Sequence, residues 1–182
     1  MTWASERCIE VPIAHEYLRE FASGTTLEVG NVLSHYGVIR HQVLDKFEKG
    51  PGIINADIVE FHPTERFDLV LSISTFEHIG FDDESPEGSG KKILSAIASC
   101  RKLLKPTGKM VMTVPIGYNP DLDQMIAQNA LGTAEEIYYK KIQRFKWVPS
   151  SKTEALACDY KHPFPYANAI LVAEFARETA PA

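Results

Sequence analysis

The sequence has 182 residues, of which 45% are hydrophobic and 24% charged, and its formal net charge is −5. This length suits one domain with a sizeable core and is short for two. Lys and Arg are scattered, which argues against nucleic acid as the main partner, and no apolar run reaches the roughly 20 residues that span a bilayer.

The cysteines and the N-terminal sequence indicate the cellular compartment in which the protein is expected. Cys8, Cys100 and Cys158 are widely spaced and form no CxxC pair. They predict reduced thiols and give no indication of a metal site. The N-terminus lacks the basic-then-apolar plan of a signal peptide. We therefore expect a cytoplasmic protein. A homo-oligomer is possible, but nothing in the sequence supports one.

Helices and strands are predicted to alternate from the start of the chain. A helix is expected from Pro12 to Gly24, with an apolar face. About two turns of helix are expected between the first and second strands. Three strands are expected in this half of the chain: 26–30, 41–44 and 53–59.

The best strand signal lies at 67–74. Its nearly continuous apolar run is typical of a strand buried on both faces of a parallel sheet. A polar loop from Asp82 to Gly90 leads to the strongest helix, 91–104. A fifth strand at 109–114 follows and ends at Pro115. Alternation at this spacing needs crossover connections, so the sequence predicts an α/β, doubly wound sheet.

Two local signals predict a helical insertion at about 118–143. Asn119-Pro120-Asp121 provides an N-cap, a first-turn proline and an acid at the positive end of the helix dipole. Thr133-Ala134-Glu135-Glu136 fits a capping box, and Glu136 lies four residues before Lys140. We expect this insertion within a single domain over 1–182, followed by two last strands near 145–148 and 169–175.

One short stretch joins the sheet to a candidate ligand site. Thr26-Leu27-Glu28-Val29-Gly30 is an apolar strand that ends in an acid and a glycine. Ligands of open α/β sheets bind at the carboxyl ends of the strands, and glycine permits a sharp turn there. A carboxylate at this position needs hydrogen-bond partners, so Glu28 either binds a ligand or stabilises the structure.

The motifs in this order resemble the class I methyltransferases that use S-adenosylmethionine. Leu27-Glu28-Val29-Gly30 resembles the first motif of that family. Asp45 falls where the family has its ribose-binding acid, and Asp57 where it has the acid that recognises the adenine amino group. The stretches 67–79 and 103–109 resemble the fourth strand with its continuation and the turn into the fifth strand.

The resemblance implies a Rossmann-like seven-stranded sheet, mostly parallel with an antiparallel last strand, and helices on both faces. It also implies S-adenosylmethionine as the cofactor. The cofactor-binding residues that it suggests lie within or directly after the first four expected strands: Glu28, Gly30, Asn31, Asp45, Asp57, Ile58, Ser72 and Ser74.

The resemblance also suggests His78 and Glu77 as catalytic residues. Histidine titrates near neutral pH, which suits removal of a proton from a hydroxyl or an amine as the methyl group moves. Structural roles stay open for these residues and for the two later acids. His78 and Glu77 could instead have only the structural role of beginning a helix. Asp45 could lie in a solvated turn, and Asp57 could cap the following turn.

The chain departs from the family in its first loop. The family usually continues Gly-x-Gly-x-Gly, whereas this chain has Gly30-Asn31-Val32-Leu33-Ser34. Val32 is β-branched and resists the dihedrals that a glycine could adopt. Either the loop takes another path or cofactor affinity is reduced. The expected function is methyl transfer to a small polar acceptor, such as a sugar or another small metabolite. The alternative is a non-catalytic methyltransferase-like binding or partner domain.

Overall fold

The structure is a computed structural model that describes residues 5–82 and 89–177. Within these residues one sheet contains eight strands, in the order β3-β2-β1-β4-β5-β8-β6-β7. Their bounds are β1 (Thr26–Val29), β2 (Gln42–Leu44), β3 (Ile53–Ile54), β4 (Phe67–Ile73), β5 (Leu104–Pro115), β6 (Glu135–Gln143), β7 (Lys146–Ser150) and β8 (Ala169–Ala176).

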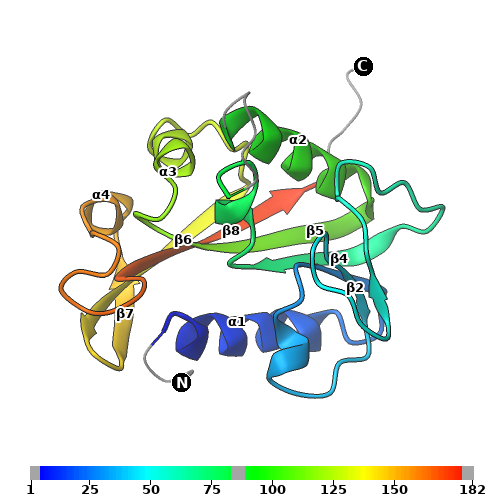
Figure 1. Ribbon diagram of the computed structural model, residues 1–182, viewed down its shortest axis with the longest axis horizontal. Helices are drawn as coiled ribbons and strands as arrows, with labels where there is room; N and C mark the ends of the chain where they lie inside the picture. The colour runs from blue at the N-terminus through cyan, green and yellow to red at the C-terminus, as the bar shows by residue number, and fades with distance from the viewer. Residues whose placement is uncertain (1–4, 83–88, 178–182) are drawn as a thin grey trace.

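Helices cover both faces of this sheet. In Figure 1, α1 lies on one side of the strands, and α2 and α3 lie on the other. A short α4 follows β7, and single 3₁₀ turns, η2 and η3, follow β1 and β4. The bounds are α1 (Arg7–Glu20), η2 (Leu33–His35), η3 (Phe76–His78), α2 (Ser89–Lys102), α3 (Pro120–Ala127) and α4 (Lys152–Leu156).

The first five strands form the parallel half of the sheet. β1 pairs with β2 and β4, β2 with β3, and β4 with β5, all in parallel. Successive β4 side chains point to opposite faces: Leu69 and Leu71 join the core beneath α1, whereas Val70 joins the core beneath α2. The predicted α/β sheet with its buried central strand is confirmed.

The other half of the sheet is antiparallel, and it corrects the predicted strand count. β8 pairs antiparallel with both β5 and β6, so the expected antiparallel last strand is present but lies inside the sheet. β7 forms an antiparallel hairpin with β6. This hairpin strand makes the sheet eight-stranded instead of seven-stranded.

The helical insertion predicted for 118–143 is correct only for α3. Asn119 caps that helix as expected, since its side chain accepts hydrogen bonds from the backbone N–H groups of Asp121 and Leu122. Residues 135–143 form β6 instead, with Tyr138 opposite Leu171 of β8.

The local helix signals in β6 lose to sheet pairing. The Thr133 hydroxyl donates to Glu136 Oε1 at 3.0 Å, which is a bond between side chains and not the reciprocal side-chain-to-backbone pair of a capping box, and no helix follows. Glu136 pairs with Lys152, and Lys140 pairs with Glu154. The predicted Glu136–Lys140 pair therefore does not form. Aromatic and β-branched side chains on both faces of 135–143 favour a strand packed on both sides.

Other boundaries also differ from the sequence prediction. α1 begins at Arg7 and continues through Pro12, because the buried Glu10 and Ala14 anchor it to the sheet on either side of the proline. The third strand is limited to β3, and β5 begins at Leu104. The predicted polar loop from Asp82 to Gly90 lies mostly outside the described residues.

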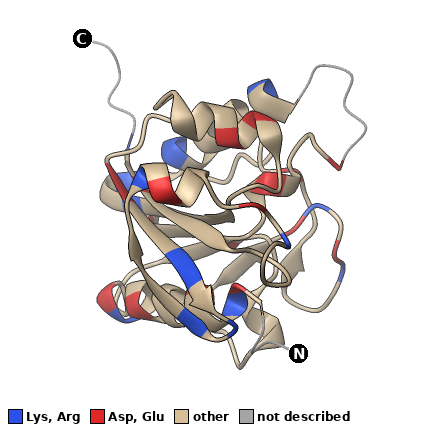
Figure 2. Cartoon of the chain, turned by 90° about the vertical axis from the view of Figure 1, so that its left-hand side faces the viewer, with Lys and Arg blue, Asp and Glu red and all other residues tan. Residues whose placement is uncertain are grey.

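Charge and hydropathy are unremarkable on the scale of the whole fold. In the view of Figure 2, Lys and Arg positions are interspersed with Asp and Glu positions and do not gather by sign. In the described parts of the chain, no helix has both the length and the apolar composition needed to cross a membrane.

Candidate active site

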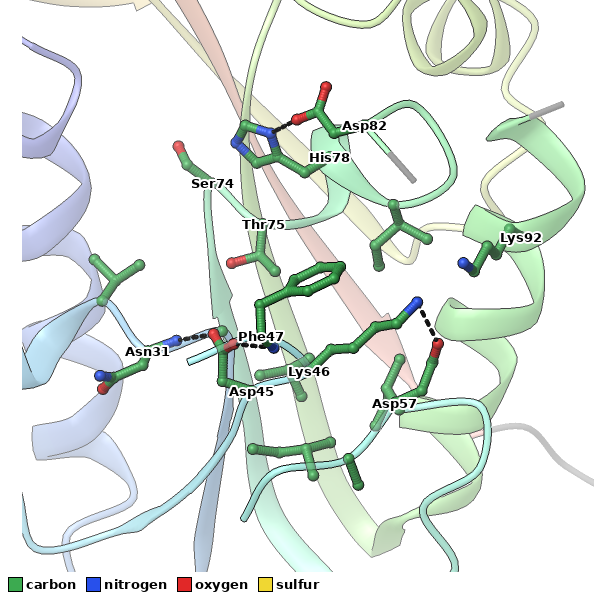
Figure 3. A pocket seen from close by; sticks show the side chains of 17 residues that line it. Asn31, Asp45, Lys46, Phe47, Asp57, Ser74, Thr75, His78, Asp82 and Lys92 are labelled. Atoms are coloured by element: carbon green, nitrogen blue, oxygen red, sulfur yellow. Dashed lines mark hydrogen bonds and ion pairs between the residues drawn. The ribbon is translucent and has the colours of Figure 1, made fainter. Parts of the chain in front are cut away.

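A cavity of about 520 Å³ opens at the carboxyl ends of β1, β2 and β4 (Figure 3). Parallel strands of an open sheet end at the same edge, which is where such folds bind ligands. Four loops and one residue of α2 form its wall. The polar and charged lining residues are Asn31, Asp45, Lys46, Asp57, Ser74, Thr75, His78, Asp82 and Lys92.

Gly30 makes the turn that leaves room for this cavity. Its φ is +88°, and an added Cβ would lie 2.1 Å from the Thr75 hydroxyl oxygen. Its N–H donates to the Leu44 carbonyl at 2.8 Å, which joins the ends of β1 and β2. The backbone at this position therefore requires glycine.

Val32 does not need the glycine that the family pattern has there. Its φ of −104° and ψ of −49° lie in the right-handed helical region that any residue adopts. The loop thus takes a path that suits a β-branched residue, and the Val32 side chain becomes part of the cavity wall.

Glu28 holds this loop from inside the protein. Its Oε1 accepts hydrogen bonds from the N–H groups of Val32 at 2.9 Å and Leu33 at 2.8 Å. Its Oε2 lies 2.6 Å from His41 Nε2, and the side chain is fully buried. Glu28 is not among the cavity-lining residues, which corrects the expectation that all three acids point to one ligand.

Asp45 connects the loops after β1 and β2. Its Oδ1 accepts hydrogen bonds from Phe47 N–H at 2.8 Å and Glu48 N–H at 2.7 Å, and its Oδ2 accepts one from Asn31 N–H at 3.0 Å. A carboxylate has about four acceptor positions, so one remains on Oδ2 at the cavity wall.

Asp57 combines the turn-capping role with a place in the cavity. Its Oδ1 accepts a hydrogen bond from Val59 N–H at 3.0 Å, and its Oδ2 lies 3.2 Å from Lys46 Nζ. Lys46 extends across the cavity to reach it (Figure 3). The neighbouring Ile58 adds an apolar wall. No sequence motif pointed to Lys46 as a residue of this site.

Asn31 and the two predicted serines differ in their positions. Asn31 lines the cavity, and its Nδ2 donates to Glu48 Oε1 at 2.7 Å, while its buried Oδ1 has no hydrogen-bond partner among the described residues. Ser72 is buried in the sheet and donates to the Val29 carbonyl at 2.8 Å, so it does not line the cavity. Ser74 does line it.

Ser74 has a strained backbone at the end of β4. Its φ is +39°, which is unusual for a residue other than glycine. Its hydroxyl donates to Glu10 Oε1 at 2.7 Å, and its N–H donates to the Thr113 carbonyl at 2.8 Å. Strain of this kind costs about 1–3 kcal/mol and is concentrated at functional sites.

His78 lies in the cavity wall between two carboxylates. Its Nδ1 is 2.5 Å from Asp82 Oδ2, and its Nε2 is 3.7 Å from Glu77 Oε1. The Tyr118 ring packs edge-on against the imidazole, with 4.9 Å between the ring centroids. The spacing of four residues between His78 and Asp82 could have revealed this pair from sequence.

Glu77 lies inside the protein beside this histidine. The residue is 2% exposed, does not line the cavity, and its Oε2 has no hydrogen-bond partner among the described residues. Burial raises the pKa of Glu77 well above its ordinary value, and the neighbouring Glu10 carboxylate raises it further. Glu77 and His78 are thus brought together, although only His78 reaches the cavity.

Replacing Gly30 with alanine should destabilise the protein. The positive φ and the contact with Thr75 predict a loss of at least about 1–3 kcal/mol in the free energy of unfolding, or a Tm lower by about 3–10 °C. Gly37 provides the control, because an added Cβ there meets no heavy atom within 4 Å. Thermal unfolding followed by circular dichroism measures both. Equal Tm values for the two variants would contradict the role given to Gly30.

Replacing Glu77 with glutamine should stabilise the protein at high pH. Because the folded pKa is raised, the unfolded chain releases a proton that the folded chain retains, so stability falls as pH rises above the ordinary carboxyl value of about 4.3. The variant does not lose stability in this way. Its free energy of unfolding should exceed that of wild type by about 1–3 kcal/mol at pH 8, with a smaller difference at pH 4.

Urea unfolding at both pH values tests this expectation. The titratable groups that act on Glu77 are Glu10, Arg7 and Glu6, with His78 beside it, and all remain in the variant. Replacement of the exposed Glu16 of α1 with glutamine is the control for loss of a carboxylate. If the Glu77→Gln variant is no more stable than wild type at pH 8, the conclusion that the Glu77 carboxyl is buried with an unpartnered oxygen is wrong.

Comparisons with known proteins agree on the fold. No protein-family model matches the sequence, and no curated protein matches it. Solved structures do match. One is the N-methyltransferase NodS from Bradyrhizobium japonicum in complex with S-adenosyl-L-homocysteine, with a TM-score of 0.54 and 16% identity, over 93% of this chain and 88% of that one.

Two further structures show the same likeness. One is the 1,6-didemethyltoxoflavin-N1-methyltransferase from Burkholderia thailandensis with its substrate and S-adenosylhomocysteine, at a TM-score of 0.52 and 16% identity, over 94% of this chain and 79% of that one. The other is an S-adenosylmethionine-dependent methyltransferase from Thermotoga maritima, at 0.50 and 10% identity, over 98% of this chain and 100% of that one. The chain therefore has the α/β fold of the S-adenosylmethionine-dependent methyltransferases.

Proposed function

We propose that this protein transfers a methyl group from S-adenosylmethionine to a small polar acceptor. The observation that carries the proposal is the cavity at the carboxyl ends of β1, β2 and β4, where the Gly30 turn, the open acceptor position of Asp45 and the Asp57–Ile58 segment share one wall. The methyltransferase fold supports it.

The residues of the cavity fit the cofactor chemically. Asp45 Oδ2 can accept a hydrogen bond from a ribose hydroxyl, and Ile58 offers an apolar surface for the adenine ring. Asp57 can accept a bond from the adenine amino group when Lys46 Nζ gives up that carboxylate. The buried, unpartnered Oδ1 of Asn31 can accept a bond from the amino group of the methionine portion.

The charge of the cavity wall also suits this cofactor. Three carboxylates line it, those of Asp45, Asp57 and Asp82, against two ammonium groups, those of Lys46 and Lys92. An excess of negative charge favours a cationic sulfonium over its neutral thioether product. The wall thus favours the methyl donor over the demethylated product.

The protein's part in the reaction is alignment and proton removal. When bound, the sulfonium supplies an activated methyl group. Holding a nucleophile in line with it can lower the barrier by about 7–11 kcal/mol. His78, oriented through Nδ1 by Asp82, presents Nε2 to take a proton from the acceptor, and a base so placed adds about 10²–10⁴-fold.

A turnover assay tests the proposal. The protein is incubated with S-adenosylmethionine and a panel of small amines, phenols and sugars, and S-adenosylhomocysteine is quantified by mass spectrometry. We expect acceptor-dependent product with wild type and much less product with Asp45→Ala. Cofactor binding without turnover across the panel would favour the non-catalytic alternative, and no cofactor binding would contradict the proposed methyl transfer.

A further inference from the structure

A groove between α1 and the β6–β7 hairpin lies apart from the proposed active site. Helix and hairpin are neighbours in Figure 1, and the larger part of the groove between them has a volume of about 750 Å³. A smaller part continues along α1 past β8, and Ile13, Glu16 and Tyr139 line both parts. None of the residues that line the groove lines the proposed cofactor cavity.

The walls of this groove are mainly apolar. Phe145, at the turn of the hairpin, is 61% exposed, and Pro12 of α1 is also exposed. Contiguous apolar surface that faces water is typical of a site that contacts another molecule. The apolar side chains that the two walls bring together are Ile9, Pro12 and Ile13 of α1 with Tyr139, Phe145 and Trp147 of the hairpin.

The two rims of the groove carry opposite charges. Glu16 lies on the α1 rim, whereas Arg144 and Lys146 flank Phe145 on the hairpin rim. The guanidinium carbon of Arg144 lies 5.2 Å from the centre of the Phe145 ring. None of these three charged residues forms an ion pair within residues 5–82 and 89–177. The groove thus has an acidic rim and a basic rim with an apolar surface between them.

The other charged groups near the groove interact within the chain. Glu174 lines the smaller part and pairs with Lys109 at 2.8 Å, and Glu20 lies 4.0 Å from the same ammonium group. Lys141 is 6% exposed, and its Nζ lies 4.9 Å from the centre of the Trp147 ring. The charge difference between the rims therefore rests on Glu16 against Arg144 and Lys146.

A second copy of the chain has the charges that match these rims. A two-fold axis that runs along the groove, in the plane of the interface, places the α1 rim of each copy opposite the hairpin rim of the other. Glu16 of each copy then faces Arg144 of its partner. Interfaces of this self-complementary kind are the commonest in symmetric dimers.

A dimer joined at the edge strands of two sheets is disfavoured. β7 is the last strand in the sheet order, so one of its edges has no neighbouring strand among the described residues. Pro149 in this strand has no N–H to donate, and Lys146 adds a charge. Proline and lysine on an edge strand oppose pairing with another strand. The groove, and not the strand edge, is thus the surface suited to a second copy.

We propose that this protein forms a two-fold dimer through the groove, with Phe145 of each copy packed against α1 of the other. This surface is separate from the proposed active site, so the dimer and the methyl transfer can be tested independently.

Sedimentation equilibrium of the full chain tests the inference. We expect the 20.3 kDa monomer at about 1 μM and twice that mass at about 200 μM. Phe145→Ser should raise the dissociation constant of the dimer at least about 100-fold, because both copies lose an aromatic anchor. Phe47→Ser is the matched control, since Phe47 is 72% exposed and does not line the groove. It should keep the dissociation constant of wild type.

An exchange of charges tests the orientation of the two copies. Glu16→Arg and Arg144→Glu should each weaken the dimer about 5–20-fold, because each places like charges opposite one another. The double variant should return to within about threefold of wild type. Circular dichroism establishes that each variant is folded.

Three outcomes would overturn the inference. The first is a wild-type chain that stays monomeric at about 200 μM, which would leave the groove to a different partner. The second is a folded Phe145→Ser variant with the dissociation constant of wild type. The third is a double charge variant that dimerises no more tightly than either single variant, since the two rims would then not face each other.

Discussion

Replacing Asp45 with alanine should weaken the binding of S-adenosylmethionine by about 100-fold. The change removes the acceptor for a ribose hydroxyl and frees the three backbone N–H groups that Asp45 binds in the loops after β1 and β2. A hydrogen bond to a charged group contributes about 1.5–3 kcal/mol, and each 1.4 kcal/mol is tenfold in affinity. Calorimetric titration measures the effect.

Two control variants distinguish the loss of a hydrogen-bond acceptor at position 45 from the general loss of a negative charge. Asp45→Asn keeps one acceptor oxygen and should lose less affinity than alanine does. Asp159→Ala removes an exposed carboxylate outside the cavity wall and should bind the cofactor as wild type does. An Asp45→Ala variant whose affinity stays within threefold of wild type would exclude this residue as a cofactor ligand.

Replacing His78 with alanine should lower kcat by about 10²–10⁴-fold, the usual contribution of a positioned base. Because His78 is assigned to the acceptor and not to the adenosyl group, the affinity for S-adenosylmethionine should change by less than about threefold. Single-turnover rates, measured with an acceptor found in the panel assay, give the chemical step directly. A rate equal to wild type would remove His78 from the mechanism.

Asp82 can be distinguished as a positioning residue for that histidine. Its Oδ2 contacts His78 Nδ1 at 2.5 Å and accepts a hydrogen bond from the Tyr118 hydroxyl at 3.3 Å. Asp82→Asn should therefore lower kcat about tenfold with KM for the acceptor nearly unchanged. A higher KM with unchanged kcat would assign Asp82 to acceptor binding instead.

The parallel half of the fold could be read from the sequence because its signals are local. The apolar run of β4 and the Gly30 turn each specify their own structure, and the structure follows them. β6 could not be read this way, since the Thr133–Glu136 signal is local whereas the pairing with β8 is not. Tertiary pairing decided the conformation there.

The site was predictable where a residue lies within five positions after the end of a strand. Asp45, Asp57 and His78 were expected at strand ends, and all three line the cavity. Glu28 was expected there too, but its carboxylate turns inward to hold the loop. That direction depends on backbone N–H groups whose positions no sequence pattern specifies.

Glu10 shows a different limit of sequence reasoning. It lies in α1, more than 60 residues from Ser74 and more than 100 from Thr113 in the chain, yet it bonds both hydroxyls. Within α1 its acidic side chain resembles any other first-turn acid. Only the packing of that helix across the sheet places it next to Glu77.

A crystal structure of the protein with S-adenosylhomocysteine would show whether the cavity at the ends of β1, β2 and β4 holds the cofactor. We expect the ribose within hydrogen-bond distance of Asp45 Oδ2, the adenine beside Ile58 and the sulfur on the side of Ser74 and His78. An adenosyl group bound elsewhere on the protein, or an empty cavity at saturating ligand, would contradict it.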